Sequence, residues 1–218
     1  MRRMACMIPE SPVETGSAAE RRLFERLRDE TPDEIVAFHS VAWQLPDDKG
    51  RPQQGESDFV LAHPGYGVLT LEVKGGSVRY DSQAGKWLTV DKRGESQIKD
   101  PARRAQDSSH LLRKALARAA RDGGTTASFG YGVAFPDCRV DRRILRPNLP
   151  RELVLDHGDV SRVSERVERL FAHCSTATGR RRSAPTASSS SSASSPTRSS
   201  YARRSPSSSP RRSASSSA

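Results

Sequence analysis

The sequence predicts an α/β domain, in which a central mixed sheet is flanked by helices, followed by a disordered C-terminal tail. This fold class rests on the order of the local patterns, which run helix, strand, hairpin, helix, strand, helix. It rests also on a change of composition near Cys174, after which Ser, Arg, Pro and Ala dominate the chain. We therefore expect a flexible N-terminus over residues 1–15, one domain over 16–174 and a tail over 175–218.

The first helix is predicted to run from about Ser17 to Asp29. Ser17 and Glu20 have the spacing of a capping box, in which each side chain caps the backbone of the other residue. Pro32 then helps to end the helix. The apolar positions recur on one helical face: Leu23, Phe24 and Leu27.

Strand patterns dominate the next part of the chain. Residues Glu34–Trp43 are rich in β-branched and aromatic side chains, which is typical of a strand, and a polar turn segment at the surface follows over Pro46–Gln54. Two more strand patterns, Glu56–His63 and Gly67–Lys74, are separated by a three-residue turn, Pro64–Tyr66. This spacing predicts a β-hairpin.

The remaining elements are predicted from caps, turns and periodicity. They are a second hairpin (77–81 and 86–91), a helix from the N-cap Asp100 to Gly123-Gly124, strands at 128–135 and 153–155, and a helix at 160–172. The long helix carries an apolar stripe: Ala105, Leu112, Ala115, Leu116 and Ala119. The closing helix carries another: Val163, Val167, Leu170 and Phe171.

The C-terminal tail holds most of the positive charge. The chain has a net charge of +10, and the eight arginines after Cys174 are accompanied by nineteen serines and no acidic residue. Such a composition cannot bury enough apolar surface to fold, so the tail is expected to be disordered. It is either a genuine segment or the out-of-frame translation of a GC-rich gene. The remaining residues carry a net charge of only +2, so global basicity does not indicate their substrate.

The cysteines and the N-terminal sequence indicate in which cellular compartment the protein is expected. Cys6, Cys138 and Cys174 are odd in number and form no CxxC pair, so neither a disulfide framework nor a structural zinc site is indicated. There is no apolar run of the length of a signal peptide or a membrane span. We expect a soluble, cytoplasmic protein without a membrane partner.

The first hairpin brings three charged side chains together. A three-residue loop pairs Phe59 with Leu71, and the same register places Asp58 opposite Glu72. Directly opposed like charges destabilise a sheet unless a cation neutralises them. Alternation along the strand puts Lys74 on the same side as Glu72. Asp58, Glu72 and Lys74 are therefore predicted to converge.

This charged group is suited to a metal ion. Carboxylates are hard oxygen ligands for Mg²⁺ or Mn²⁺, and a lysine beside them can orient an attacking water or offset charge on a phosphate. The structural alternative is a solvated strand face with a diagonal ion pair. Glu72 argues against that alternative, because its strand, VLTLEV, is apolar on both faces and an unpartnered charge there is costly.

Several segments resemble a known family, the nuclease-related domain (NERD) of the PD-(D/E)XK superfamily. They are SAAE at Ser17–Glu20, GESDFVLAHPGYGVLTLEVKGG at Gly55–Gly76, Trp87, and VAFPD at Val133–Asp137. The central segment is the specific one. The resemblance covers most of residues 17–172. It implies a restriction-endonuclease-like core, a DNA-cleaving activity and frequent fusion to helicase domains.

The resemblance also implies roles for individual residues. Asp58, Glu72 and Lys74 take the D…E-x-K positions, and Glu20 takes that of the helix glutamate, so that Asp58, Glu72 and Glu20 are the metal ligands. For Glu20 the capping box is an equally good explanation.

The start of the long helix departs from the family pattern. Arg104 stands where a glutamine is expected, which leaves Gln106 as a weak match. Arg103 and Arg104 are candidate phosphate contacts, against the alternative of a solvated helix face. His63 and His110 are expected to be packing or surface residues.

Three functions are compatible with these observations. The first is a Mg²⁺- or Mn²⁺-dependent DNA nuclease that works in DNA processing or repair alongside a helicase. The second is a catalytically weak nucleic-acid-binding module that positions DNA for a partner helicase. The third places the function in the Arg/Ser tail, as an RNA-binding or phosphorylation-regulated segment. Tyr201 is the tail's one aromatic residue, so the tail offers no stacking platform for bases.

Overall fold

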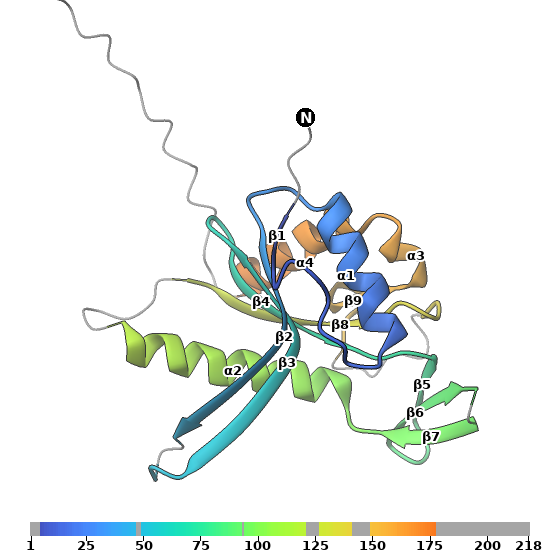
Figure 1. The fold of residues 1–218 in the computed structure, drawn as a ribbon. Helices are drawn as coiled ribbons and strands as arrows, with labels where there is room; N and C mark the ends of the chain where they lie inside the picture. Colours follow the sequence, from blue (N-terminus) through green and yellow to red (C-terminus); the bar gives the residue numbers. More distant parts are fainter. Residues whose placement is uncertain (1–4, 47–48, 93, 121–126, 141–148, 178–218) are drawn as a thin grey trace, which may run out of the picture. The chain divides into compact units, whose positions relative to one another are not determined.

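In a computed structural model of the chain, the described residues are 5–46, 49–92, 94–120, 127–140 and 149–177 (Figure 1). They all belong to the first of two compact units, Met1–Pro185. The strands within this part are β1 (Cys6–Ile8), β2 (Val36–Pro46), β3 (Pro52–His63), β4 (Gly67–Val73), β5 (Ser77–Asp81), β6 (Lys86–Asp91), β7 (Gly94–Ile98), β8 (Phe129–Phe135) and β9 (Val154–Asp156). The helices are α1 (Ala18–Glu30), α2 (Pro101–Ala119), the 3-10 turn η2 (Arg151–Leu153), α3 (His157–Val160) and α4 (Val163–Ala177).

The strands form two sheets within the described residues. The larger sheet has the order β1-β2-β3-β4-β8-β9 and the smaller one the order β5-β6-β7. In the larger sheet β2, β3 and β4 are antiparallel to one another, whereas β1, β8 and β9 each pair in parallel with a neighbour. The expectation of a mixed central sheet in an α/β domain is confirmed.

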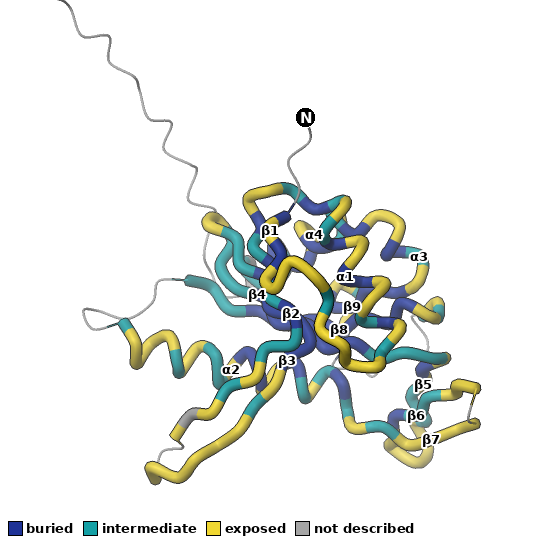
Figure 2. The backbone as a smooth tube through the Cα atoms, in the orientation of Figure 1, coloured by how far each residue is buried: buried dark blue, intermediate teal, exposed yellow. Residues whose placement is uncertain are grey.

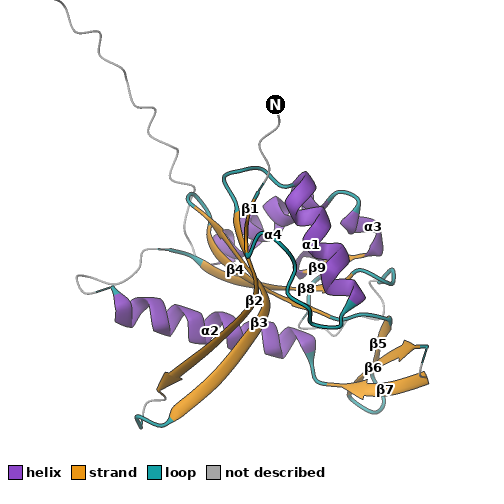
Figure 3. Cartoon of the chain, in the orientation of Figure 1, coloured by secondary structure: helices purple, strands orange, loops and turns teal. Residues whose placement is uncertain are grey.

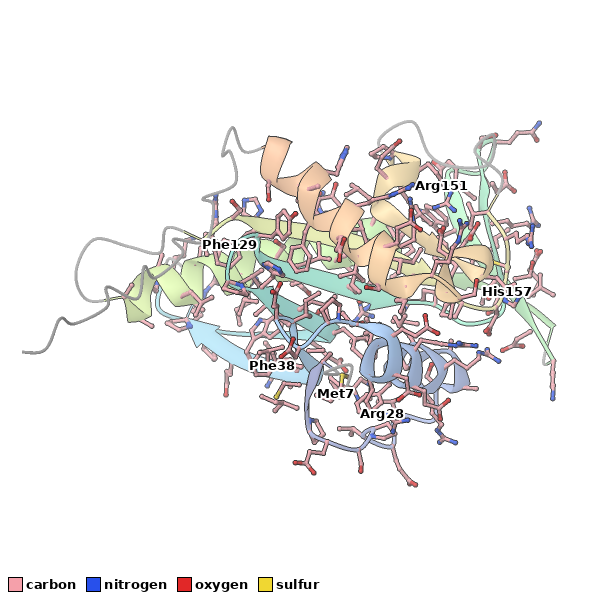
Figure 4. The ribbon with its side chains drawn as sticks, turned by 90° about the horizontal axis from the view of Figure 1, so that it is seen from above. Met7, Arg28, Phe38, Phe129, Arg151 and His157 are labelled. Atoms are coloured by element: carbon pink, nitrogen blue, oxygen red, sulfur yellow. The ribbon has the colours of Figure 1, made fainter. Side chains whose placement is uncertain are left out.

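Helices cover both faces of the larger sheet (Figures 1 and 3). Helices α1 and α4 lie side by side over one face, as the view from above shows (Figure 4). Helix α2 packs against β3, β4 and β8 on the other face. The largest side chains of the core are fully buried between the layers: Phe24, Phe59, Phe135 and Phe171.

The first hairpin has the predicted register. Phe59 pairs with Leu71 and Leu61 with Leu69, across the turn at residues 64–66. The turn closes against a neighbouring strand, because Gly67 has φ +97° and Val68 donates its N–H to the Ser128 carbonyl at 2.8 Å. The turn chemistry therefore fixes which strand residues face each other.

Several other elements agree closely with the sequence. Helix α1 begins after Ser17, whose hydroxyl accepts the Glu20 N–H at 3.2 Å, and α2 begins after Asp100, whose carboxylate accepts the Arg103 N–H at 3.1 Å. The four apolar residues predicted to face the core from the closing helix are buried. Strands β5 and β6 have the predicted bounds.

Strand pairing extends further than composition indicated. The surface turn expected over Pro46–Gln54 is wrong in its extent, because β2 and β3 stay paired as far as Pro46 and Pro52. Strands β1 and β7 were not predicted either. In β7 and in the distal part of β3 the side chains are polar and mostly exposed (Figure 2), which hides the strand pattern, since backbone pairing needs no apolar side chain. Strand β1 has only three residues, which is too short for a pattern.

The two later helices also differ from expectation. In α2 the predicted stripe is buried at Ala105, but it is half-exposed at Leu112 and exposed at Leu116. The helix ends at Ala119, and the expected stop at Gly123-Gly124 lies outside the described residues.

The closing helix is divided into α3 and α4. Asp156 starts α3, accepting the N–H groups of Gly158 and Asp159 in a capping box, and the helical pattern restarts at Val163.

The predicted tail needs a smaller correction. Helix α4 continues to Ala177, so residues 175–177 belong to the helix and not to the tail. The Ser175 hydroxyl donates to the Tyr66 carbonyl at 3.5 Å, which ties this last turn to the first hairpin. Residues 178–218, on which the rest of the tail prediction falls, lie outside the described part. Among the described residues, no helix is both long and apolar enough to cross a bilayer.

Candidate active site

The larger sheet divides at Asp58, in a place that we call the fork and define by Ser40, Asp58 and Val73. The regular pairing of β3 with β4 begins at Phe59 and Leu71, so the expected backbone pair of Asp58 with Glu72 is absent. On the other side of β3, the pairing with β2 also omits Ser40 and Asp58, and Ser40 has φ +54°. Beyond this point β2 and β3 continue as a two-stranded arm beside α2 (Figure 1).

The side chain of Asp58 replaces the missing backbone acceptor. Its Oδ2 accepts the Val73 N–H at 2.6 Å, and the neighbouring Ser57 hydroxyl donates to the Phe59 carbonyl at 2.9 Å. These bonds satisfy backbone groups that the broken ladder would otherwise leave buried without a partner. Asp58 therefore holds the fork together while its second oxygen stays available.

Glu72 and Lys74 lie on the same side of β4, as strand alternation predicted. Lys74 Nζ is 2.8 Å from Glu72 Oε1. The Glu72 side chain is 1% exposed and that of Lys74 23% exposed, so the pair runs from the core toward solvent. A solvated strand face does not describe it.

Arg104 is a second cation on Glu72. Its Nε lies 3.0 Å from the same Oε1. Neither cation meets hydrogen-bond geometry at that oxygen, so the contacts are ion pairs by proximity. Arg103, the neighbour of Arg104 in the sequence, pairs instead with Asp107 one turn along the helix, and Gln106 is exposed. Of the three weak nucleic-acid candidates, the structure brings Arg104 alone to the carboxylates.

Glu20 reaches the fork from α1. Its backbone N–H is capped by Ser17, but the reciprocal bond of a capping box is absent, since Ser17 N–H donates to Thr15 Oγ1 at 3.3 Å. The Glu20 carboxylate lies instead 3.6 Å from Nε2 of His39, a buried residue of β2. The cap explains the helix start, and the side chain faces the sheet.

The electrostatics of Asp58 show that these groups act on one another. The pKa of Asp58 is raised from 3.8 to about 7, first by burial and next by the negative charge of Glu72. The Val73 hydrogen bond and the charge of Lys74 lower the pKa, and Glu20 raises it. The pKa of Asp58 therefore reflects both its burial and the charges of Glu72, Lys74 and Glu20 around it.

The donor set fits a hard divalent cation. Asp58, Glu72 and Glu20 offer carboxylate oxygens, and a cation among them would relieve the repulsion that, after burial, raises the pKa of Asp58. As placed, however, no three His, Cys, Asp or Glu side chains in the described ranges lie close enough together to hold a metal ion. Glu72 lies instead beside Lys74 and Arg104, and the Glu20 carboxylate lies beside His39.

A groove lies beside this cluster. It has a volume of about 810 Å³ and runs between helix α2 and the arm formed by β2 and β3. Its lining includes Trp43, whose indole lies across Gly55, and the amides of Gln44 and Gln54. Arg104, which lies beside Glu72, also lines this groove.

The sequence did not predict His39 as a member of this site, nor the contact of Arg104 with Glu72. His39 lies in an apolar strand, where an isolated histidine gave no signal of its own beyond its period-two spacing with core residue Ala37. The contact of Arg104 depends on how α2 crosses the sheet, which local sequence does not encode. Of the two histidines expected to be packing or surface residues, His63 makes tilted ring contacts with Tyr66 and Phe171, and His110 is exposed.

The fold and the site together define an α/β domain with a D…E-x-K group at a sheet fork and a groove beside it. Comparison with protein families finds a match to the nuclease-related domain over residues 15–136. The chain belongs to this family. The matched region contains the fork and α2 but ends before β9, α3 and α4. Neither the curated proteins nor the solved structures contain a match to the chain.

Proposed function

We propose that this chain hydrolyses phosphodiester bonds in DNA with Mg²⁺ or Mn²⁺ as cofactor, in DNA processing or repair alongside a helicase activity. The single observation that carries the proposal is the convergence of Asp58, Glu72 and Lys74 at a buried fork. Membership of a nuclease-related family supports the reaction class. DNA repair and the helicase partner rest on the family resemblance alone.

Asp58 and Glu72, with Glu20 beside them, would hold the cofactor. When bound, Mg²⁺ or Mn²⁺ supplies positive charge at the scissile phosphate and makes an attacking water more acidic. Asp58 is fixed in place by its bond from Val73, so that one carboxylate oxygen keeps a constant position without ligand. This is the preorganisation that a phosphoryl-transfer site needs.

Lys74 is suited to the chemical step. Its ammonium group lies between the buried Glu72 and solvent, where an attacking water can reach it. From there it orients that water and offsets the charge that develops on the phosphate oxygens. The groove between α2 and the β2–β3 arm would hold the nucleic-acid strand beside Arg104, which contacts Glu72.

The experiment is cleavage of single- and double-stranded DNA by the purified chain, with and without Mn²⁺. We expect Asp58→Ala, Glu72→Ala and Lys74→Ala each to reduce the rate by roughly a hundredfold or more. Glu95→Ala is the control, because Glu95 also pairs with a cation, Arg79 at 2.7 Å, but on the exposed small sheet. A folded variant of any of the three residues that cleaves at the wild-type rate removes that residue from the site.

A second function is favoured by one observation. Arg104 and Lys74 already compensate the charge of Glu72, which a metal ion would do in an active nuclease. A catalytically weak module that binds DNA and positions it for a helicase would need no more than this. Such a module binds DNA in a gel-shift experiment and shows no Mn²⁺-dependent cleavage, whereas the nuclease shows both.

A further inference from the structure

His39 occupies a buried position beside the fork. It is 3% exposed and pairs with Phe59 across the strands, directly before the break in pairing at Ser40 and Asp58. Its ring lies between two phenylalanines, with centroid distances of 5.3 Å to Phe24 and 4.7 Å to Phe59. The ring therefore has a fixed orientation.

The hydrogen bonds of the ring select its tautomer. Nδ1 accepts the N–H of Val13 at 3.2 Å, so this nitrogen presents its lone pair. A neutral imidazole with Nδ1 as acceptor must carry its hydrogen on Nε2. A protonated imidazole would carry a hydrogen on Nδ1 as well and could not accept from Val13, so this hydrogen bond requires the neutral form.

Nε2–H has one carboxylate in front of it. His39 Nε2 is fully buried and makes no hydrogen bond to any described residue, and Glu20 Oε2 lies 3.6 Å from it. A buried donor without an acceptor is unfavourable, and a movement of a few tenths of an ångström by Glu20 would satisfy it. Glu20 is available for that movement because it does not complete the capping box with Ser17.

We propose that His39 is a positioning residue, which holds the Glu20 carboxylate toward the fork through its Nε2–H so that Glu20 can serve as a ligand of the divalent cation. The inference rests on the proposed function, because it concerns the same metal site. In this role His39 does not touch metal or substrate. It selects one direction of a glutamate that its helix cap leaves free to rotate.

Two substitutions separate the two ring nitrogens. In His39→Asn the side-chain oxygen can still accept from Val13, but no donor reaches Glu20. In His39→Gln the amide nitrogen lies near the position of Nε2 and can donate to Glu20, while the acceptor for Val13 is lost. A purely structural histidine would tolerate Asn at least as well as Gln.

The measurement is Mn²⁺ affinity of the full chain by calorimetry, with melting temperatures of every variant. We expect His39→Asn to weaken binding about tenfold and His39→Gln to stay near wild type. The control is His63→Asn, because His63 Nδ1 also accepts a backbone N–H, from Gly65 at 2.9 Å, and its Nε2 also faces a carboxylate, Glu34 at 3.4 Å. It lies at the turn end of β3, and its substitution should leave Mn²⁺ affinity unchanged.

A mutant cycle and a spectrum complete the test. In a Glu20→Ala background, His39→Asn should cause no further loss, and an equal loss in both backgrounds would overturn the inference. In the wild type, long-range ¹H–¹⁵N spectra should show the hydrogen of His39 on Nε2, and a hydrogen on Nδ1 would overturn it even if every variant unfolds.

The two proposals fail in different ways. If wild type binds no Mn²⁺, the proposed function fails and this inference falls with it. If wild type binds Mn²⁺, Asp58→Ala loses binding and His39→Asn keeps it, then the role of His39 alone is wrong.

Discussion

Asp58 has two roles that compete with each other. Its carboxylate replaces a backbone acceptor at the fork, and it also lies near Glu72 and Glu20 in a buried place. Burial and the charge of Glu72 raise its pKa to about 7, so the native state holds a proton that the unfolded chain releases near its ordinary value of 3.8. The buried carboxylate therefore lowers the free energy of unfolding at neutral pH, and it is also one of the groups that could bind a cation.

The first prediction concerns this proton. Between pH 4 and pH 7 the native state binds more protons at Asp58 than the unfolded state, so the free energy of unfolding must fall as pH rises through this range. From the raised pKa of about 7 against 3.8 we expect a decrease of roughly 4 kcal/mol by pH 8 in EDTA. Denaturant unfolding of wild type and Asp58→Asn at pH 4.5, 6 and 8 measures it.

Asp58→Asn should abolish this contribution. The amide oxygen can still accept from Val73 and carries no charge, so the variant should be the more stable protein at pH 8 without metal. Millimolar Mn²⁺ should stabilise wild type more than the variant. Parallel pH dependences of the two proteins would show that Asp58 titrates normally.

The second prediction concerns Arg104, which occupies an oxygen of Glu72 at 3.0 Å. Arg104→Gln removes a positive charge that competes with a cation for Glu72, so Mn²⁺ should bind more tightly, by roughly tenfold or about 1.4 kcal/mol. Arg103→Gln is the matched control on the same helix, because Arg103 pairs with exposed Asp107. Weaker Mn²⁺ binding by Arg104→Gln would mean that Arg104 supports the metal site.

At the scale of elements, the first hairpin positions the site through its turn. The turn at residues 64–66 fixes the register of β3 and β4, and Gly67 lets β4 begin directly beside Ser128 at the start of β8. The loop after β4 is also fixed, since Gly76 N–H donates to Asp137 Oδ2 at 2.9 Å. Both ends of the strand that carries Glu72 and Lys74 are thus anchored to the β8 side of the sheet.

The third prediction tests this anchoring at Gly67. A Cβ there would lie 2.2 Å from the Ser128 carbonyl oxygen and 2.7 Å from its nitrogen, and the φ of +97° is itself unfavourable for alanine. Gly67→Ala should therefore cost about 3 kcal/mol or more of unfolding free energy in denaturant titrations.

Gly94 provides the comparison. It has φ +111°, but no atom lies within 4 Å of an added Cβ, so Gly94→Ala should cost only about 1 to 2 kcal/mol from the backbone conformation. Equal costs at the two positions would show that β4 and β8 separate easily at this end.

At the scale of the whole molecule, the folded domain includes the last turn of α4. Cys174 packs against Gly130 of β8, where an added Cβ would lie 2.4 Å from the cysteine Sγ, and Ser175 bonds to the Tyr66 carbonyl. The last turn thus closes the layer of α4 over the larger sheet.

The fourth prediction compares two shortened chains. A chain that ends at Ala177 should keep the melting temperature of the 218-residue chain, because the composition of the segment removed offers no apolar periodicity for packing. A chain that ends at Ala172 loses the contacts of Cys174 and Ser175, and its melting temperature should fall by roughly 4 to 8 °C. Thermal unfolding by circular dichroism measures both. Equal melting temperatures of the two shortened chains would place the boundary earlier.

The sequence by itself determined the elements whose signals are local. A three-residue turn fixed the register of β3 and β4, and period-two alternation placed Glu72 and Lys74 on one side of the strand. Caps at Ser17 and Asp100 fixed the starts of α1 and α2. Polar strands such as β7 escaped prediction, because their pairing satisfies backbone groups without an apolar pattern.

Only the tertiary structure decided how the charges at the fork balance. Three features of the site depend on segments that are far apart in the chain. They are the break in strand pairing at Asp58, the direction of Glu20 toward His39 and the contact of Arg104 with Glu72. No local propensity encodes them, since each depends on how helices cross the sheet and on what water is excluded. The physical reason is that a pKa or an ion pair depends on the three-dimensional surroundings of the group, whereas a turn or a cap depends only on residues nearby in the sequence.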